Sequence, residues 1–433
     1  MTLKIDIFLN KKILIYGLGK SGLSTFYFLN KKSDVFLYDD FKFGKKNPKL
    51  KNNIINYKDI LKFKFDKIIL SPGIDINNCK LSKFLKRNTE KIYTDLDIFY
   101  LFNRNYCITI TGTNGKSTTC QLLYEVLVKQ KLDVKLAGNI GKPILSIKNI
   151  KKRSIFVIEA SSYQLEYSKI FKSHCAVILN ISPDHIERHK TIKRYVKAKF
   201  KLLKSQFKGD LAFVKKNDRL INKELKLSKL KSKIIKVNTK IKNNFFINIK
   251  NKYFQNETIR ENLFFVYEIS KKLNLNKKLF VDTIENFKGL KYRQQIIYNK
   301  SKLTIINDSK STSFSSSVGV LKINSNIYWL LGGIPKKGDK FTLPKKYLNK
   351  TKAFIYGKNY SFFNKQLKNK IRIENFKNLK IALSRIFALT KHEKIIDKTI
   401  LFSPCAASFD TFKNFEDRGS YFNKLVKDYF HAK

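Results

Sequence analysis

The segment that most constrains this chain is a glycine-rich loop between a β-rich apolar run, residues 106–111, and a helical run that starts at Lys116. A strand that turns through small residues into a helix is typical of α/β proteins. The loop N–H groups and the helix N-terminus together bind phosphate. Lys116 would reach the β- and γ-phosphates of a nucleotide, and the Ser117 hydroxyl would ligate Mg²⁺. The predicted nucleotide contacts are Gly112, Thr113, Asn114, Gly115, Lys116, Ser117 and Thr118.

The match to the general pattern G-x-x-x-x-G-K-[ST] is incomplete, because Ile110 stands where the first glycine belongs. A G-K-S-T tetrapeptide is common by chance. This one lies between a strand and a helix and has Gly112 before it, and that position favours phosphate binding over coincidence.

A second glycine turn lies near the N-terminus. The sequence GLGKSG, residues 17–22, follows the apolar run 12–16 and completes a G-x-G-x-x-G pattern. Twenty residues past Gly19 stands Asp39, where dinucleotide-binding folds place the acid that binds ribose. These residues raise the hypothesis of an NAD-dependent oxidoreductase.

Apolar strand-like runs alternate with helical runs along the whole chain, which indicates an α/β fold. The pattern restarts twice, so we expect three domains, with the boundaries 1–93, 94–289 and 290–433. At 433 residues the chain is too long for one ordinary core. Residues 200–255 are rich in lysine and asparagine and predict no clear structure.

Composition narrows the class of protein. Hydrophobic residues make up 43% of the chain, enough for packed cores, yet no apolar run approaches the length that spans a bilayer. The N-terminus lacks a signal-peptide pattern. Five scattered cysteines argue against a disulfide framework or a cysteine metal cluster. We therefore expect a cytoplasmic protein without membrane insertion.

The net charge is unusual, because 89 Lys and Arg stand against 33 Asp and Glu, a formal charge of +56. A polyanion partner would explain it, but such proteins concentrate their charge on one face or tail. Here the lysines occur in every segment, and residues with A/T-rich codons are abundant throughout. Compositional drift is therefore the preferred explanation, and no nucleic-acid partner is expected.

Polar residues that follow other strands are candidate ligands. Glu159 ends the run 155–159, and Asp184, His185 and His189 cluster after another strand. Strand-end acids beside a phosphate loop can hold Mg²⁺, although each alone is more often a surface or capping residue. The turn Ser71-Pro72-Gly73 also follows a strand, and is either a ligand loop or a plain turn.

Five motifs, in this order along the chain, resemble the Mur ligase family. They are GTNGKST (112–118), GNIG (138–141), EASSYQLE (159–166), NISPDHIERH (180–189) and YVKAKF (195–200). Three later motifs, NDSKSTS (307–313), GGIPKKGD (332–339) and SPCAASFDTFKNFEDRG (403–419), are similar to the D-glutamate-adding branch of that family.

The resemblance implies a Rossmann-like UDP-binding N-terminal domain, a central P-loop-type ATPase domain and a Rossmann-like C-terminal domain. It implies an ATP-dependent ligase that adds D-glutamate to UDP-N-acetylmuramoyl-L-alanine through an acyl phosphate, in peptidoglycan precursor synthesis. Two Mg²⁺ ions, a carbamylated lysine and a monomeric state are expected with it. This reaction would bring two carboxylates and a triphosphate together. Mg²⁺ ions, lysines and oriented N–H groups would offset their negative charge.

Residue roles follow from the matched positions. Ser117 and Glu159 would hold the first Mg²⁺, and His185 would help to hold a second. Lys199 matches the carbamylated lysine, and we expect its neighbours Arg194, Lys197 and Lys201 to depress its pKa. The residues matched to UDP-sugar contacts are Leu18, Gly19, Lys20, Asp39, Ser71, Pro72, Gly73, Asn139 and Gln164.

In the third domain, Arg293, Asp308 and Lys310 match positions that close over ATP. The positions matched to D-glutamate binding are Thr312, Lys336, Ser408 and Phe415.

The chain departs from the family pattern at several of these positions. Tyr292 stands where histidine is frequent, and Ser313 where asparagine is frequent. On the adenine side Asn262 is retained, but Glu261 precedes it and Phe265 replaces a second asparagine.

Rival functions predict other features. An NAD oxidoreductase needs a larger N-terminal sheet, and here a phosphate loop follows residue 93 instead. A nucleic-acid-dependent ATPase needs helicase-like motifs, and none is found. Another Mur ligase or a folylpolyglutamate synthase-like amide ligase would share the ATP domain but lack SPCAASFD, residues 403–410.

Overall fold

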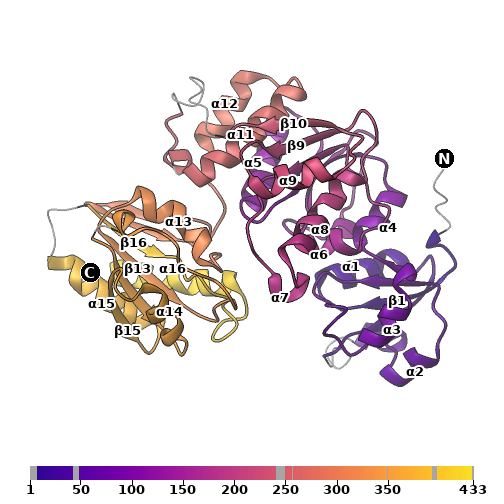
Figure 1. Ribbon diagram of the computed structural model, residues 1–433, viewed down its shortest axis with the longest axis horizontal. Helices are drawn as coiled ribbons and strands as arrows, with labels where there is room; N and C mark the ends of the chain where they lie inside the picture. Colours follow the sequence, from indigo (N-terminus) through magenta and orange to yellow (C-terminus); the bar gives the residue numbers. More distant parts are fainter. Residues whose placement is uncertain are drawn as a thin grey trace. The chain divides into compact units, whose positions relative to one another are not determined.

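The computed structural model describes residues 7–41, 48–239, 249–255, 257–348, 350–392 and 397–431. The chain divides into two compact units (Figure 1). Unit 1 comprises residues 1–250 and 261–286, and unit 2 comprises residues 251–260 and 287–433.

The first sheet of unit 1 has four parallel strands in the order β2-β1-β3-β4. Its strands are β1 (Lys12–Tyr16), β2 (Asp34–Tyr38), β3 (Lys67–Leu70) and β4 (Ile92–Tyr93). Its helices are α1 (Lys20–Leu29), α2 (Tyr57–Lys62), α3 (Ser82–Arg87) and α4 (Asp95–Phe102). Apolar side chains of β1 alternate between two cores, one with α1 and α4 and the other with α2 and α3, so both faces of the sheet are covered.

The second sheet of unit 1 has six parallel strands in the order β10-β9-β8-β5-β7-β6. Its strands are β5 (Tyr106–Thr111), β6 (Val134–Gly138), β7 (Ile155–Glu159), β8 (Cys175–Ile178), β9 (Leu211–Lys215) and β10 (Lys233–Val237). The helices of this part are α5 (Lys116–Lys129), α6 (Ser162–Tyr167), α7 (Ile186–His189), α8 (Ile192–Lys204), α9 (Arg219–Leu227), α11 (Glu257–Lys272) and α12 (Lys277–Asn286), the first turn of α11 belonging to unit 2.

Unit 2 contains a six-stranded sheet in the order β11-β12-β16-β13-β14-β15, parallel except for the antiparallel edge strand β11. Its strands are β11 (Gln295–Lys300), β12 (Leu303–Asn307), β13 (Ile327–Gly332), β14 (Lys352–Tyr356), β15 (Arg372–Phe376) and β16 (Lys398–Phe402). Its helices are α13 (Phe314–Ile323), α14 (Tyr360–Leu367), α15 (Leu379–His392) and α16 (Phe415–His431).

Side-chain alternation along β13 gives the sheet of unit 2 two cores. Trp329 and Leu331 pack with α13 and α14 on one face, whereas Tyr328 and Leu330 pack with α15 and α16 on the other. Helices on both faces make this a doubly wound sheet.

Each sheet changes winding direction at one strand. β1 lies between β2 and β3, and β5 lies between β7 and β8. In unit 2, β16 returns to lie between β12 and β13. Ligands of doubly wound sheets bind at the carboxyl ends of the strands at such points. The two glycine-rich turns follow β1 and β5 and therefore lie at these positions.

The predicted α/β class with parallel sheets is confirmed, and the antiparallel β11 is an addition to it. Helix α4 begins directly after Thr94, because Thr94 and Asp97 form a capping box. Within the uninformative stretch 200–255 the structure has α9 and β10, while residues 240–248 lie outside the described part. The three domain boundaries stay a prediction.

Within the described residues, no helix combines the length and apolar character needed to cross a bilayer. The five cysteines are free thiols.

Candidate functional site

The phosphate loop joins β5 to α5 through a backbone that favours glycine. Gly112 has a φ of 155° and Gly115 a φ of 86°. A Cβ atom on Gly115 would lie 2.2 Å from Oδ1 of Asn262, so α11 approaches the loop closely here. The structure therefore brings Asn262 beside the start of α5, where phosphate is expected to bind.

The loop after β8 holds the phosphate loop in place. Asn180 accepts a hydrogen bond from the Asn114 N–H (2.9 Å) and donates one to its carbonyl (3.1 Å). The Thr113 hydroxyl lies 3.1 Å from both the Ser182 carbonyl oxygen and the Tyr195 hydroxyl. Because these partners come from β8 and α8, the loop is fixed by the surrounding fold.

Two lysines meet behind the phosphate loop. The Lys116 ammonium donates to the carbonyls of Gly112 (2.9 Å) and Thr113 (2.8 Å). Lys199, on α8, is 1% exposed, and its Nζ donates to the same Gly112 carbonyl at 2.8 Å. The structure thus places Lys199 directly against the loop predicted to hold the triphosphate.

Burial lowers the pKa of Lys199 well below its usual value, and the nearby positive charge of Lys116 lowers it further. This corrects the expected cause. Lys197 is exposed on the same helix, and the Lys201 ammonium binds the Glu166 carbonyl instead. The neighbours in sequence do not supply the effect because they project from other faces of α8.

An oxygen-rich pair lies at the other side of the loop. Glu159, which ends β7 and is 1% exposed, accepts hydrogen bonds from the Ser117 hydroxyl (2.6 Å) and the Asn139 amide (2.8 Å). Carboxylate and hydroxyl oxygens are the ligands that Mg²⁺ prefers. The structure therefore brings together these three predicted residues, which come from α5, the loop after β6 and the end of β7.

His185 lies in a different cluster. It adopts a left-handed backbone (φ 54°), and its ring lies 4.9 Å from that of Tyr163 and 3.4 Å (Nε2) from the Asp184 carboxylate. His189 is buried and lies 3.0 Å from the Ser162 hydroxyl. In the described residues, no three His, Cys, Asp or Glu side chains are gathered as a metal site. His185 therefore lies against Tyr163 and Asp184, directly before α7.

Three loops meet at the carboxyl edge of the first sheet. Asp39 accepts hydrogen bonds from the N–H groups of Leu18 (2.6 Å) and Phe41 (3.0 Å). The Ser71 hydroxyl donates to the Gly17 carbonyl at 2.6 Å. Asp39 and Ser71 thereby fix the glycine turn. Gly19, Pro72 and Gly73 lie in the same loops, and Lys20 begins α1.

The close approach of the glycine turn to α1 makes a testable prediction. A Cβ on Gly22 would lie 1.9 Å from the Gly17 carbonyl oxygen, so Gly22→Ala should lower the free energy of unfolding by about 3 kcal/mol. Gly19 has no atom within 4 Å of such a Cβ, and Gly19→Ala serves as the matched control. Circular-dichroism melting checks this, and equal melting temperatures for the two variants would contradict the packing.

Arg188 connects the two sheets of unit 1. Its guanidinium donates to the carbonyls of Pro72 (2.8 Å) and Ile74 (2.6 Å) and stacks 4.0 Å from the Tyr163 ring. The Ser71-Pro72-Gly73 segment is therefore more than an isolated turn. Gln164 is buried, 3% exposed, and its amide lies 3.4 Å from the Asp95 carboxylate.

In unit 2, Asp308 follows β12 and is buried. Its carboxylate accepts hydrogen bonds from the Gln294 N–H (3.1 Å) and the Ser403 hydroxyl (2.9 Å). Burial raises the pKa of Asp308 to about 7, and these hydrogen bonds and the charge of Arg293 oppose the increase. The carboxyl therefore changes its protonation near neutral pH.

This pKa predicts a pH-dependent stability. The protonated Asp308 contributes fully below about pH 4, the range where the unfolded group titrates, and its contribution is lost as the pH rises through about 7. Asp308→Asn removes the titration, so it should raise the melting temperature at pH 8 by roughly 5–10 °C, and less at pH 5. Fluorescence of Trp329, the one tryptophan of the chain and buried in unit 2, reports this unfolding.

The exposed carboxylate of Asp410 provides the matched control. Asp410→Asn should leave the dependence of melting on pH unchanged. If Asp308→Asn gave the same shift at pH 5 and pH 8, the raised pKa of Asp308 would be wrong.

The other residues predicted in the third domain lie on loops of unit 2, except Phe415, which begins α16. The Lys310 ammonium lies 3.9 Å from the Phe415 ring centre, and the Arg293 guanidinium lies 6.0 Å from it. Lys336 is half-buried whereas Lys337 is exposed, and the choice of the first as ligand stays a prediction. Ser408 is buried after β16, and Thr312 is half-buried after β12.

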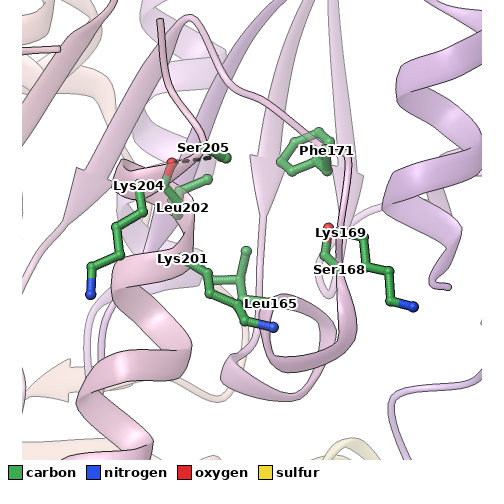
Figure 2. Close-up of a pocket in the computed structure, with 8 residues that line it drawn as sticks. All are labelled: Leu165, Ser168, Lys169, Phe171, Lys201, Leu202, Lys204 and Ser205. Carbon is green, nitrogen blue, oxygen red and sulfur yellow. Dashed lines mark hydrogen bonds between the residues drawn. The ribbon is translucent and has the colours of Figure 1, made fainter. Parts of the chain in front are cut away.

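A cavity of about 350 Å³ lies elsewhere in unit 1, between α6 and α8 (Figure 2). Leu165, Phe171 and Leu202 supply apolar walls, while Lys169 and Lys204 point away from each other. The Lys169 ammonium already binds the carbonyls of residues 89 and 90. The predicted site residues do not line this cavity.

Sequence reasoning assigned no role to several residues that shape these sites. Asn180, Arg188 and Tyr195 lie inside the motifs 180–189 and 195–200, but no spacing rule connects them to loops 60 or more residues away. Their hydrogen-bonding partners are mostly backbone groups. Every residue type carries these groups, so the sequence does not reveal such contacts.

The fold and these loops define an α/β nucleotide-binding protein, with a phosphate-binding loop at the switch point of its central sheet. Comparisons narrow that class. Residues 110–281 match the Mur ligase middle domain, and residues 11–93 match the N-terminal domain described as Mur ligase MurD-like. The chain belongs to the Mur ligase family.

Curated relatives match over almost the entire chain. A Rickettsia felis protein named UDP-N-acetylmuramoylalanine–D-glutamate ligase is 34% identical, covering 96% of this chain and 97% of its own. A relative of the same name from Buchnera aphidicola subsp. Schizaphis graminum is also 34% identical, covering 97% of this chain and 99% of its own.

Solved structures share the fold. The MurF ligase of Thermotoga maritima, solved in complex with ADP, matches with a TM-score of 0.59 and 14% identity, covering 98% of this chain and 99% of its own. UDP-N-acetylmuramate-alanine ligase of the same organism matches with a TM-score of 0.55 and 17% identity, covering 98% of this chain and all of its own.

Proposed function

We propose that this protein is an ATP-dependent ligase that joins D-glutamate to UDP-N-acetylmuramoyl-L-alanine, in the synthesis of peptidoglycan precursors. The observation that carries the proposal is near-full-length similarity, at up to 34% identity, to proteins named for this reaction. The phosphate loop, with Lys199 behind it and Glu159 beside it, provides the chemistry that such a ligase needs.

The phosphate loop suits the triphosphate of ATP. The first N–H groups of an α-helix have no partner within the helix, and at the start of α5 phosphate oxygens would suit them. Lys116, which now donates to two loop carbonyls, is close enough to exchange them for phosphate oxygens. ATP would supply the phosphoryl group that turns the L-alanine carboxylate into an acyl phosphate.

The residues beside the loop suit Mg²⁺. Ser117 and Glu159 present adjoining oxygen atoms at 2.6 Å, and Asn139 orients the carboxylate from its other side. These residues would hold the first ion, and His185 would take part in holding a second. Bound there, Mg²⁺ would neutralise charge that develops on phosphate oxygens.

Lys199 suits a carbamate. Only an unprotonated amine captures CO₂, and burial beside Lys116 lowers the pKa of Lys199 in the required direction. The carbamate would present two oxygen atoms beside the phosphate loop, and it would replace a buried cation with an anion that Lys116 can stabilise.

The first sheet would hold the UDP moiety. The turn Leu18-Gly19-Lys20 would bind the diphosphate, and Ser71-Pro72-Gly73 would flank it. Asp39 fixes the turn through the Leu18 N–H, and its other carboxylate oxygen accepts from the Phe41 N–H. This carboxylate would lie on the uridine side. Asn139 and Gln164 would lie toward the sugar.

Loops of the third domain would bind the amino acid. Lys336, with the hydroxyls of Thr312 and Ser408, would bind the two carboxylates of D-glutamate, and Phe415 would pack against its carbon chain. Arg293, Asp308 and Lys310 would close over ATP. The D-glutamate amine then attacks the acyl phosphate, and the resulting tetrahedral species collapses to the amide and phosphate.

The test is a phosphate-release assay with a panel of amino acids. We expect release from ATP to require both UDP-N-acetylmuramoyl-L-alanine and D-glutamate. Release with L-lysine, meso-diaminopimelate or L-alanine, but not with D-glutamate, would overturn the assignment. The same proposal places the reaction in the cytoplasm with small-molecule substrates, a monomeric enzyme and no nucleic-acid partner.

A further inference from the structure

Arg418 is a buried cation at the centre of the ligand loops of unit 2. It lies in the first turn of α16 and is fully buried (0% exposed). Its guanidinium donates to the carbonyls of Ser309 (2.7 Å), Ala406 (2.9 Å) and Gly332 (3.5 Å), and its Nε donates to the Ser309 hydroxyl (3.1 Å). One planar guanidinium group therefore connects the loops that follow β12, β13 and β16.

Each of these three loops carries a residue proposed to bind a substrate. Lys310 directly follows Ser309, Lys336 lies four residues past Gly332, and Ser408 lies two residues past Ala406. The loops after β13 and β16 are also paired with each other, through backbone hydrogen bonds of 2.8 and 2.9 Å between residues 334 and 407. A displacement of the Arg418 guanidinium would therefore move all three loops together.

One buried carboxylate acts on the charge of Arg418, because that charge lowers the pKa of Asp308. Every acceptor is a carbonyl or hydroxyl oxygen, and within the described residues Arg418 forms no ion pair with a carboxylate. Because burial raises the pKa of Asp308 to about 7, this carboxylate offsets the charge of Arg418 only in part near neutral pH, and a partly compensated buried cation is costly to the folded protein. An anionic ligand held by the same three loops would offset that cost.

We propose that Arg418 is a positioning residue for the amino-acid substrate. It fixes the three loops that carry Lys310, Lys336 and Ser408, and its only partly compensated positive charge favours an amino acid with two carboxylates. The inference rests on the proposed function, because it takes the third domain as the D-glutamate site.

The test compares two variants. Arg418→Lys keeps the positive charge but lacks the planar guanidinium group, and Arg418→Met lacks both. We expect the KM for D-glutamate to rise about 10-fold in the first variant and about 100-fold in the second. The KM for UDP-N-acetylmuramoyl-L-alanine should stay within about twofold. Arg372→Met, at an exposed position of the same unit, is the matched control and should change neither constant.

Trp329 fluorescence checks that each variant is folded. If Arg418→Met does not fold, the Arg418→Lys measurement decides. An unchanged KM for D-glutamate in a folded Arg418→Lys or Arg418→Met variant would overturn the inference. So would equal changes in the KM values of both substrates, since a merely structural role would not separate them.

Added guanidinium gives an independent readout. In Arg418→Ala, guanidinium ions should lower the KM for D-glutamate, whereas sodium ions at the same ionic strength should not. If wild-type protein fails to use D-glutamate, the proposed function is wrong. If wild-type protein uses it and guanidinium has no effect on a folded Arg418→Ala variant, only the Arg418 inference is wrong.

Discussion

Lys199→Ala is expected to lower the ligase rate by about 100- to 1,000-fold, with little change in melting temperature. The amine is buried against the Gly112 carbonyl, directly behind the phosphate loop, and its pKa is lowered well below the usual value for lysine. Alanine removes the site of carbamate formation. It also removes a buried amine that needs no counterion when neutral, so the fold should tolerate the change.

Lys197→Ala is the matched control, because Lys197 lies on the same helix but is exposed. It should keep nearly full activity. Short carboxylic acids added to Lys199→Ala should restore part of the rate by supplying the two oxygens that the carbamate would provide. Full activity of Lys199→Ala without any additive would exclude the carbamate role.

Glu159→Gln is expected to lower the rate by about 100-fold and to raise the Mg²⁺ concentration for half-maximal activity about tenfold or more. Glutamine keeps the shape of the side chain. Its carbonyl can accept the hydrogen bond of Asn139, and its amide can donate to the Ser117 hydroxyl. The variant therefore isolates the negative charge of Glu159, and titration of the rate with Mg²⁺ measures its effect.

Glu125→Gln makes the same substitution on α5, where Glu125 accepts a hydrogen bond from Gln121 on the surface of the helix. This control should keep both the rate and the dependence on Mg²⁺. An unchanged Mg²⁺ requirement in Glu159→Gln would mean that this carboxylate does not hold the metal ion.

Much of the fold could be predicted from the sequence, because parallel strands buried on both faces leave apolar runs bounded by glycine turns. The runs 12–16 and 106–111 are β1 and β5, and both glycine turns lie at switch points. The antiparallel strand β11 could not be predicted, since its residues are half exposed and show no clear alternation.

The candidate site was predictable only where chemistry depends on residue type. Ser117 and Glu159 follow from a phosphate loop and a strand-end acid, and the structure brings them together. Arg188 and Arg418 act on carbonyls of loops distant in sequence, and a carbonyl is the same in every residue. The pKa of Lys199 is lowered mainly by burial. The basic residues that flank Lys199 in the sequence do not indicate that its side chain is buried.

The most direct test of the proposed reaction follows the oxygen atoms of the substrate. UDP-N-acetylmuramoyl-L-alanine labelled with ¹⁸O in its carboxylate is incubated with ATP, Mg²⁺ and D-glutamate, and both products are analysed by mass spectrometry. If the reaction proceeds through an acyl phosphate, we expect a D-glutamyl amide product and transfer of one ¹⁸O atom into the released phosphate. Absence of that product, or phosphate without label, would contradict it.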